Sequence, residues 1–274
     1  MMTETSRLIR LKMKANKISK FDLSVVIPIH NAEKTIEEAL SSVVSQHLPE
    51  NFTAEIILVD DQSTDNSMKK ATEFLENKGF SFKALATEHQ SGPGGARTLG
   101  VKNSSADLIA FIDSDDIWAE DKLLKQLEAL KNSNAVMCST GREFLNADGT
   151  HTGVTVGVKP IVTYKDLLKT NSISLSSVVI KREALLKYPM TSDTSVHEDY
   201  ICWLKVLKEY GTCVGIDEPL LYYRKSDTQV SAGTGKTAVK HLKSLRQAGI
   251  NPFMSVIYFV SYAVNGVIKH KGFK

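Results

Sequence analysis

The stretch Leu108-Ile-Ala-Phe-Ile-Asp-Ser-Asp-Asp116 joins an apolar run to three carboxylates, and it decides the fold class. The run from Leu108 to Ile112 predicts a strand that is buried on both faces, as in a parallel sheet. Open α/β sheets bind ligands at the carboxyl ends of their strands, and three carboxylates there are costly unless a cation binds them. Mg²⁺ and Mn²⁺ usually bind substrate phosphates as well as protein carboxylates, so the stretch favours a metal–diphosphate site. The alternative is that Ser114 or Asp115 only caps a following helix.

The composition is that of an ordinary globular protein. The 274 residues can bury a sizeable core, and 42% hydrophobic with 24% charged residues is ordinary for a soluble globular protein. The formal net charge of +3 is too small to indicate nucleic-acid binding, so we expect none. The three cysteines have no metal-ligand spacing and suit reduced thiols in a cytosolic protein. The first 20 residues have no apolar core between their basic residues, so we expect no secretory signal.

Strand patterns alternate with helix patterns through the first half of the chain. This alternation predicts an α/β fold with a mostly parallel, doubly wound sheet that is flanked by helices. Besides the run that ends at Ile112, apolar runs predict strands over these ranges: 23–29, 55–59, 82–87, 135–140 and 175–180. The polar segment 141–160, with Asp148-Gly149, suits a hairpin or a mobile loop.

Polar capping residues precede several runs with helical spacing. Asn31 is expected to cap one helix, and Ser63, Thr64 or Asp65 to cap the next, which Gly79 ends. The glycine-rich loop 91–95 is expected to open a short helix that runs through Leu99. Further helices are predicted over these ranges: 123–130, 164–170 and 198–210.

Carboxylates also end the second predicted strand, and an arginine follows the glycine-rich loop. Asp60 and Asp61 can accept hydrogen bonds from a base or a ribose, although Asp-rich loops also serve as turns. The loop Gly92-Pro-Gly-Gly95 lacks the Gly-x-Gly-x-x-Gly spacing of a dinucleotide fold and does not follow the first strand. Its glycines still allow a ligand to approach the backbone closely. Arg97 can bind a phosphate there or form a surface ion pair.

The residues His197-Glu198-Asp199 begin a predicted helix. Acids in a first helical turn interact favourably with the helix dipole, which is one explanation for them. The other is that a carboxylate here is a general base, if the fold brings it to the diphosphate site. By itself, His197 is more typical of a hydrogen-bonded surface residue than of a ligand.

Five segments, taken in order, resemble a known family over residues 22–230. The segments are Leu23-Ser-Val-Val-Ile-Pro-Ile-His-Asn31, Leu58-Val-Asp-Asp-Gln-Ser-Thr-Asp65, Gly94-Gly-Ala-Arg-Thr-Leu-Gly100, Phe111-Ile-Asp-Ser-Asp-Asp116 and His197-Glu-Asp199. The series closely resembles the family-2 glycosyltransferases with the GT-A fold, of the kind that builds bacterial surface polysaccharides. The resemblance implies an inverting transferase that uses a nucleotide-diphosphate sugar, with UDP expected, and Mn²⁺ or Mg²⁺.

The resemblance also implies where the nucleotide binds. Pro28, His30 and Asn31 would border its pocket, and Asp60 or Asp61 would contact the base. Asp113, which is expected near the ribose, and its neighbour Ser114 would belong to the same donor site, where Arg97 would also contact the nucleotide.

The metal and the acceptor are assigned in the same way. Asp113 and Asp115 match the Asp-x-Asp element of the family, with Asp115 as the expected direct metal ligand, whereas Asp116 has no assigned role. Asp199 matches the Glu-Asp element and would be the catalytic base. Trp118 would line the sugar or acceptor site, or it is a core aromatic.

Four positions depart from the pattern of the family. His30 stands where tyrosine is frequent, so stacking on the base would differ. Gln62 replaces a frequent glycine, and Thr98 replaces a frequent asparagine. Ser226 stands where a histidine often follows the segment that ends in Arg224, which puts a metal or phosphate ligand from that loop in doubt.

The resemblance suggests how the chain is divided. A basic lead-in (1–21) would precede a nucleotide-sugar-binding half (22–116), an acceptor-binding half of the same large domain (117–230) and a C-terminal helical extension (231–274). The extension contains the apolar run 253–268, followed by basic residues. This run is short for a membrane span, and two explanations remain open. It forms a helix on a membrane surface, or a helix packed on the domain or on a second subunit in a homodimer.

We therefore expect a cytoplasmic enzyme, peripheral at the inner face of the cell membrane in the first case. It would transfer a sugar to a saccharide or a lipid-linked saccharide. One rival is a nucleotidyltransferase, which would have a glycine-rich phosphate loop where His30-Asn31-Ala32 stands. The other rival is a non-catalytic protein that binds sugar nucleotides, and Asp199 argues against it.

Overall fold

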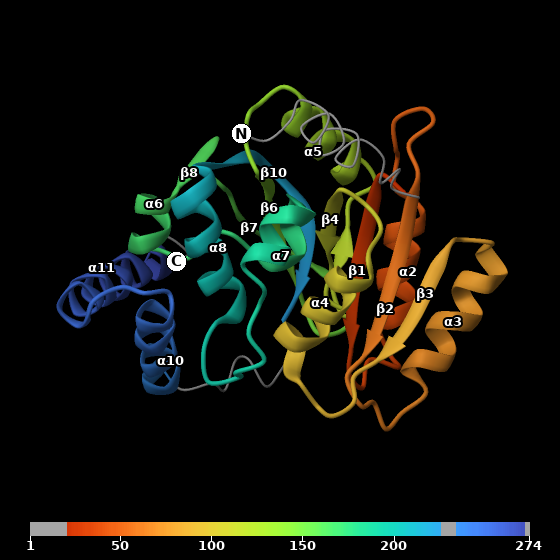
Figure 1. The fold of residues 1–274 in the computed structure, drawn as a ribbon, viewed down its shortest axis with the longest axis horizontal. Helices are drawn as coiled ribbons and strands as arrows, with labels where there is room; N and C mark the ends of the chain where they lie inside the picture. Colours follow the sequence, from red (N-terminus) through yellow and green to blue (C-terminus); the bar gives the residue numbers. More distant parts are fainter. Residues whose placement is uncertain (1–20, 226–233, 272–274) are drawn as a thin grey trace, which may run out of the picture.

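The computed structural model describes the backbone of residues 21–225 and 234–271, as a central sheet of ten strands with helices on both faces (Figure 1). The predicted lead-in, apart from Phe21, and Ser226 lie outside the described residues. The strands are β1 (Leu23–Ile29), β2 (Ala54–Asp60), β3 (Phe82–Ala86), β4 (Leu108–Phe111), β5 (Ile117–Trp118), β6 (Met137–Leu145), β7 (His151–Val156), β8 (Ile161–Thr163), β9 (Val179–Lys181) and β10 (Thr212–Arg224). The helices are α2 (Ile36–Val44), α3 (Ser67–Lys78), α4 (Gly92–Asn103), α5 (Lys122–Lys131), α6 (Tyr164–Lys169), α7 (Arg182–Lys187), α8 (Glu198–Tyr210), α10 (Thr234–Gln247) and α11 (Pro252–Lys271), with a 3₁₀ turn at Leu175–Ser177.

The order of the strands fixes the place of a ligand site. The sheet runs β3-β2-β1-β4-β9-β6-β10-β5, with β7 on β6 and β8 on β10. The first four strands pair in parallel, as predicted, whereas β9 is antiparallel to both of its neighbours. The chain moves outward from β1 through β2 to β3 and then returns to β4 on the other side of β1. Such a reversal opens a crevice at the carboxyl ends of β1 and β4.

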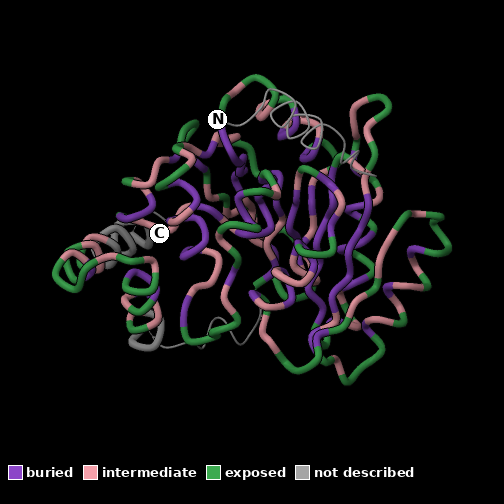
Figure 2. The backbone as a smooth tube through the Cα atoms, in the orientation of Figure 1, coloured by how far each residue is buried: buried purple, intermediate pink, exposed green. Residues whose placement is uncertain are grey.

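Alternate residues of β1 face two apolar cores. Val26 packs with Val59, Phe111 and Trp203 in the core under α4 and α8. Val25 and Ile27 pack into the other core, which α2 and α3 cover. Figure 2 shows the buried strands as a continuous band through the middle of the molecule. Because both faces of the central strands are covered, their near-continuous apolar sequence is explained.

One predicted helix start is wrong, because α2 begins at Ile36 and not after Asn31. α3 begins at Ser67 with Asn66 at its N-cap position, but the predicted Asp65 accepts the Ser67 N–H at 3.0 Å. Asn31 has a left-handed backbone (φ 52°), and its Oδ1 accepts the Thr64 N–H at 2.8 Å. The side chain therefore joins the β1–α2 turn to the β2–α3 turn instead of capping its own helix.

Of the other predictions, several are confirmed and one predicted strand forms only in part. Gly79 ends α3 in a left-handed conformation (φ 64°), and α8 spans the predicted 198–210, so both are confirmed. The segment 141–160 contains the hairpin of β6 and β7. Leu175–Ser177 is a 3₁₀ turn, however, and of the predicted strand region 175–180 only Val179 and Ile180 lie in a strand, β9. None of the helices in the part of the chain that is described combines the length and apolarity needed to cross a membrane.

Candidate functional site

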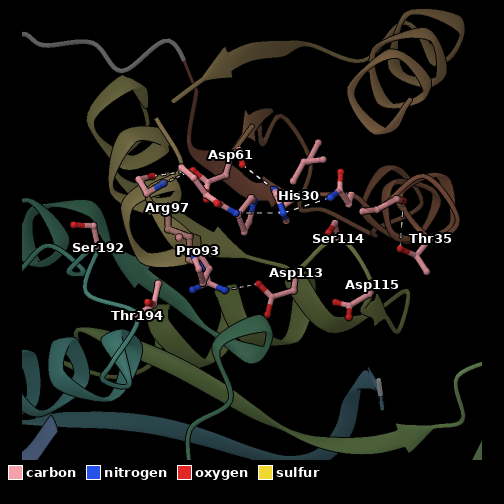
Figure 3. A pocket seen from close by; sticks show the side chains of 17 residues that line it. His30, Thr35, Asp61, Pro93, Arg97, Asp113, Ser114, Asp115, Ser192 and Thr194 are labelled. Atoms are coloured by element: carbon pink, nitrogen blue, oxygen red, sulfur yellow. Dashed lines mark hydrogen bonds and ion pairs between the residues drawn. The ribbon is translucent and has the colours of Figure 1, made fainter. Parts of the chain in front are cut away.

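A cavity of about 740 Å³ lies at the carboxyl ends of β1 and β4, where the strand order predicts a site (Figure 3). Most of the predicted site residues line it together. These are Pro28, His30, Asn31, Asp61, Arg97, Asp113, Ser114 and Asp115. Of the ten predicted residues, Asp60 and Asp199 are not part of this lining.

The turn after β2 separates the two candidate base contacts. Asp61 borders the cavity, and its Oδ1 accepts hydrogen bonds from the Ser91 N–H and the Thr87 hydroxyl, both at 2.8 Å. Asp60 instead accepts the Ser63 N–H at 3.1 Å, which is turn chemistry. The structure therefore places Asp61 of the pair beside any ligand in the cavity.

His30 is held at the rim by the same turn. Its Nδ1 lies 2.8 Å from the Asp61 carbonyl oxygen, which can only accept, so Nδ1 carries the proton. In the neutral ring, Nε2 is then an acceptor, and the Gln90 amide lies 3.4 Å from it. Position 30 thus presents the edge of an oriented imidazole to the cavity.

Arg97 connects the two halves of the sheet. Its side chain is only 5% exposed, and its Nη2 and Nη1 lie 2.5 Å from Asp113 Oδ1 and 2.9 Å from Glu198 Oε1. Burial alone would lower the pKa of Arg97, but the charges of Asp113 and Glu198 raise it above its ordinary value. The alternative of a surface ion pair is wrong, because this arginine is buried between two carboxylates.

The acidic cluster folds into a tight turn after β4. The Asp116 N–H donates to the Asp113 carbonyl at 3.1 Å, and the Asp113 N–H donates to the Ser176 hydroxyl at 3.1 Å. Burial and the charge of Asp113 raise the pKa of Asp115 to about 6. A carboxylate whose pKa is raised by a neighbouring carboxylate favours a bound cation.

Asp116 faces the interior. It is 1% exposed, and its Oδ1 accepts the Arg224 N–H at 3.2 Å. Its Oδ2 is buried without a hydrogen-bond partner among the described residues. Burial, followed by the charges of Asp113 and Asp115, raises its pKa well above the ordinary value. Asp116 therefore ties the acidic turn to β10 and does not line the cavity.

The donor set is suited to a metal that is shared with a substrate. Within residues 21–225 and 234–271, no three His, Cys, Asp or Glu side chains gather closely enough to hold a metal by themselves. Asp113 and Asp115 are the two carboxylates of the cluster that reach the cavity. Mg²⁺ characteristically binds to one or two carboxylates and takes its other ligands from phosphates and water, so the residues fit such an ion.

Asp199 lies in the first turn of α8, next to Glu198. Burial and the charge of Glu198 raise its pKa to about 6, and the charges of Arg97 and Asp113 also act on it. Its Oδ1 accepts the Tyr200 N–H at 2.7 Å. The fold therefore brings Asp199 into the electrostatic environment of the Arg97–Asp113 pair, although it lies outside the cavity lining.

The glycines before Arg97 mark contacts that sequence reasoning missed. A Cβ on Gly94 would lie 2.1 Å from the Thr191 carbonyl oxygen, and one on Gly92 would lie 2.7 Å from Thr194 Cγ2. The close approach that these glycines allow is thus made by the segment before α8, and not only by a ligand. That segment brings Ser192 and Thr194 into the cavity lining. The cluster of glycines in the sequence is the signal from which this close contact could have been predicted.

Two side chains around the acidic turn have roles in packing. Trp118 is 2% exposed, and its Nε1 donates to the Ser176 carbonyl at 2.7 Å. Lys122 Nζ lies over the indole, 4.0 Å from a ring centre. Trp118 is therefore buried as a core aromatic, and it also borders a second cavity together with Tyr222. Arg224 is 7% exposed and donates through Nε to the Asp115 carbonyl (3.0 Å), through Nη1 to Ala147 and through Nη2 to Glu38.

Comparison with known proteins identifies relatives over nearly the whole chain. The family model described as Glycosyl transferase family 2 matches residues 24–185. An Escherichia coli protein named UDP-Glc:alpha-D-GlcNAc-diphosphoundecaprenol beta-1,3-glucosyltransferase WfgD is 33% identical over 250 residues, which cover 90% of this chain and 94% of its own. TuaG of Bacillus subtilis, named as a teichuronic acid biosynthesis glycosyltransferase, is 32% identical over 248 residues, 90% and 96% of the two chains.

Solved structures share the architecture. TarS of S. aureus (residues 1–349) has a TM-score of 0.67 at 20% identity, over 89% of this chain and 71% of its own. The mannosyltransferase PcManGT of Pyrobaculum calidifontis, in complex with GDP-Man and Mn²⁺, has a TM-score of 0.67 at 16% identity, over 94% and 76%. These similarities show the GT-A-type fold, which the sequence predicted.

Proposed function

The chain belongs to glycosyltransferase family 2, and we propose that it moves a hexose from a UDP-sugar to a hydroxyl of a lipid-linked saccharide, by an inverting displacement that depends on Mn²⁺ or Mg²⁺. The observation that carries the proposal is one cavity in which Asp61, Arg97, Asp113 and Asp115 meet, with Asp199 close to the Arg97–Asp113 pair. A glycosyl transferase needs these groups together: a nucleotide pocket, a place for the diphosphate charge and a base.

Relatives support the choice of donor and acceptor. The E. coli relative is named for UDP-Glc and for an acceptor saccharide on diphosphoundecaprenol. TarS, which shares the fold, has been solved with UDP-GlcNAc. The transfer would then take place at the inner face of the cell membrane, in the synthesis of a surface polysaccharide.

Asp199 is the residue that we assign as the base. It takes the proton of the acceptor hydroxyl, whose oxygen attacks the anomeric carbon on the face opposite the diphosphate. The new C–O bond forms as the bond to the diphosphate breaks, so the anomeric configuration inverts. A pKa of about 6 leaves the Asp199 carboxylate largely ionised at pH 7 and more basic than an ordinary aspartate.

Arg97 and the acidic turn serve the leaving group. Arg97 keeps its guanidinium beside the cavity because Asp113 and Glu198 hold it from two sides. Asp115, with Asp113, would hold the divalent cation. When bound, that ion would carry part of the negative charge that develops on the leaving diphosphate.

A nucleotidyltransferase remains the less favoured function. It would be expected to cradle phosphates with glycines straight after β1, where His30-Asn31-Ala32 lie. The glycines of this chain instead begin α4, against the segment before α8. Family membership favours sugar transfer over it.

The Asp199→Asn variant tests the proposal. The exchange keeps the shape of the side chain and removes its basicity, so transfer should fall by about 10²–10⁴-fold while UDP and Mn²⁺ still bind. Transfer is measured as UDP release with and without acceptor, and binding by calorimetry. Glu120→Gln, an exposed acid outside the cavity, is the matched control. Transfer by Asp199→Asn at the wild-type rate would rule out this base.

The same residue predicts a pH dependence with two signs. Transfer should rise with pH through about 6, because Asp199 must be ionised to take the proton. Stability should move the other way. The folded pKa lies above the unfolded value, so the contribution of Asp199 to stability is full at low pH and is lost as the pH rises toward 6. At pH 7, Asp199→Asn should unfold no more easily than the wild type, and up to about 3 kcal/mol less easily.

A further inference from the structure

The hairpin of α10 and α11 is anchored to the body by one face. Leu245 and Ser244 of α10 are fully buried, and the Ser244 hydroxyl accepts the His197 N–H at 2.8 Å. On α11, Tyr258 and Phe259 pack against the core that also contains α8. Figure 1 shows the hairpin beside α6 and α8, at the end of the molecule away from β3 and α3.

The opposite face of α11 is apolar and exposed. Phe253, Val256, Ile257 and Val260 recur at the spacing of one helical face, and they are between 45% and 75% exposed. Val239 of α10 is also exposed. In the described part of the chain, seven large hydrophobic side chains are exposed, and these are five of them. An apolar patch of this kind on an otherwise ordinary surface marks an interaction site.

The charge of the same segment is unlike that of the rest. Residues 228–274 contain seven of the 34 Lys and Arg residues of the chain and none of its 31 Asp and Glu residues. Their formal charge is therefore +7, whereas the rest of the chain carries −4. Lys243 and Arg246 of α10 are exposed. The face that bears the apolar stripe thus belongs to a segment that attracts anions.

We propose that the apolar face of α11, defined by Phe253, Val256, Ile257 and Val260, binds to the surface of an anionic phospholipid bilayer, with the exposed cations Lys243 and Arg246 of the adjoining α10 contributing to the attraction. Apolar residues on one side of a helix and nearby cations are the two parts of an interfacial membrane helix. A second copy of the chain is less suitable, because it would bring one +7 segment against another. A spanning helix is also less suitable, because α11 lacks the needed apolarity over its described residues.

The proposed surface is connected to the catalytic end of α8. Besides the Ser244 bond to the His197 N–H, the His241 ring stacks on Tyr200 with 5.0 Å between ring centres. His197 and Tyr200 lie on either side of Glu198-Asp199. Docking of the hairpin would hold the first turn of α8 close to the bilayer. This step of the inference rests on the proposed function, because a lipid-linked acceptor would present its sugar at the bilayer surface.

Vesicle flotation of the full chain tests the surface. The wild type should float with vesicles that contain phosphatidylglycerol and much less with vesicles of phosphatidylcholine alone. Serine at positions 253, 256, 257 and 260 should weaken binding by at least about tenfold, and Lys243→Glu with Arg246→Glu by a similar factor. The exchanged side chains are exposed, so the fold should persist.

Matched controls use exposed residues elsewhere. Ile161→Ser with Leu186→Ser removes the two other exposed large hydrophobic residues, and Lys102→Glu with Lys131→Glu reverses two exposed cations. Both controls should bind like the wild type. The proposal is overturned if the wild type does not bind phosphatidylglycerol vesicles, or if the serine variant binds as well as the controls. It is also overturned if sedimentation shows a dimer that the serine variant dissociates, because the face then joins two copies.

A second assay keeps the failure of this inference apart from that of the proposed function. The serine variant should keep wild-type transfer to a water-soluble acceptor with a short lipid, and lose transfer to the long-chain acceptor in vesicles. Equal losses on both acceptors would mean that the face supports folding or catalysis instead of docking. If the wild type floats with the vesicles but transfers to neither acceptor, the result contradicts the proposed function and still supports the membrane-binding surface.

Discussion

The two halves of the sheet build the site in different ways. In the half that contains β1, β2 and β4, site residues follow directly from strand ends: His30 after β1, Asp61 after β2 and Asp113 after β4. In the other half, Ser192 and Thr194 come from a segment without regular structure, which packs against the glycines of α4. Parallel topology alone gathers the first group, whereas the second group depends on contacts between distant segments.

Two arginines join these halves, one from each side. Arg97 of the first half pairs with Asp113 of its own half and reaches Glu198 of the second. Arg224 of the second half donates to the Asp115 carbonyl and to the Glu38 carboxylate of the first. Variants that remove each link test how far each half keeps its structure without the other.

The largest effect is expected from Arg97→Met. It leaves Glu198 and Asp113 without their buried partner, which should cost about 3–5 kcal/mol of unfolding free energy and abolish transfer. Urea denaturation and UDP release measure the two losses. Lys70→Met is the control, because its pair with Glu33 is over one-third exposed on both sides and should contribute little to stability. Similar costs for the two variants would contradict the role of Arg97 as the link.

Removal of the metal should affect only the part of the site that the first half provides. Excess chelator, or Asp115→Asn, should reduce transfer by at least about 10²-fold, because a Lewis acid at the diphosphate contributes several kcal/mol. At pH 7, Asp115→Asn should unfold no more easily than the wild type, since burial and the charge of Asp113 raise the pKa of Asp115 and make its ionised form unfavourable in the folded state. Asp121→Asn, an exposed acid that pairs with His47, is the control. Full transfer in excess chelator would show that the reaction does not need a divalent metal.

A smaller effect is expected from Arg224→Lys. A lysine keeps the charge but cannot donate to Asp115, Ala147 and Glu38 together, so about 1–3 kcal/mol of stability should be lost. Transfer should fall because the acidic turn loses its support from β10. Arg182→Lys is the control, since Arg182 also donates to backbone carbonyls but away from the cavity. An unchanged rate would show that the turn holds its shape without the second half.

Sequence reasoning predicted the first half well for a physical reason. The apolar runs around β1, β2 and β4 are long, and the carboxyl ends of parallel strands meet at one edge, so the residues after them meet as well. Eight of the ten predicted site residues line one cavity, while their chemical roles stay predictions. Asp60 differs from Asp61 only by its direction at the strand end, which an Asp-Asp pair in a sequence does not reveal.

The errors share a cause that is equally physical. Asn31 was expected to cap a helix, but it accepts the Thr64 N–H from another turn. Glu198 does lie in the first turn of α8, as the helix-dipole explanation expects, but nothing in the sequence indicated that it also pairs with Arg97, 101 residues away. A polar side chain has several partners of similar strength, and the choice is made by which segments the fold brings near. Local pattern holds no information about that choice.

The smallest predicted effect tests a single turn of the first half. Gln62 follows Asp61 and has a left-handed backbone (φ 65°), which is unfavourable for a residue with a Cβ. Its side-chain amide donates to the Thr87 carbonyl, so it also contributes a hydrogen bond. Gln62→Ala loses that bond and keeps the strain, whereas Gln62→Gly loses the bond and relieves the strain.

The glycine variant should therefore be more stable than the alanine variant by about 0.5–1 kcal/mol, after the larger backbone entropy of glycine in the unfolded chain is counted. Thermal unfolding of both variants, beside the wild type, measures the difference. A glycine variant no more stable than the alanine variant would mean that the turn is not strained at residue 62. The glycine that is frequent in the family at this position would then serve close approach of the ligand beside Asp61, and not the conformation of the turn.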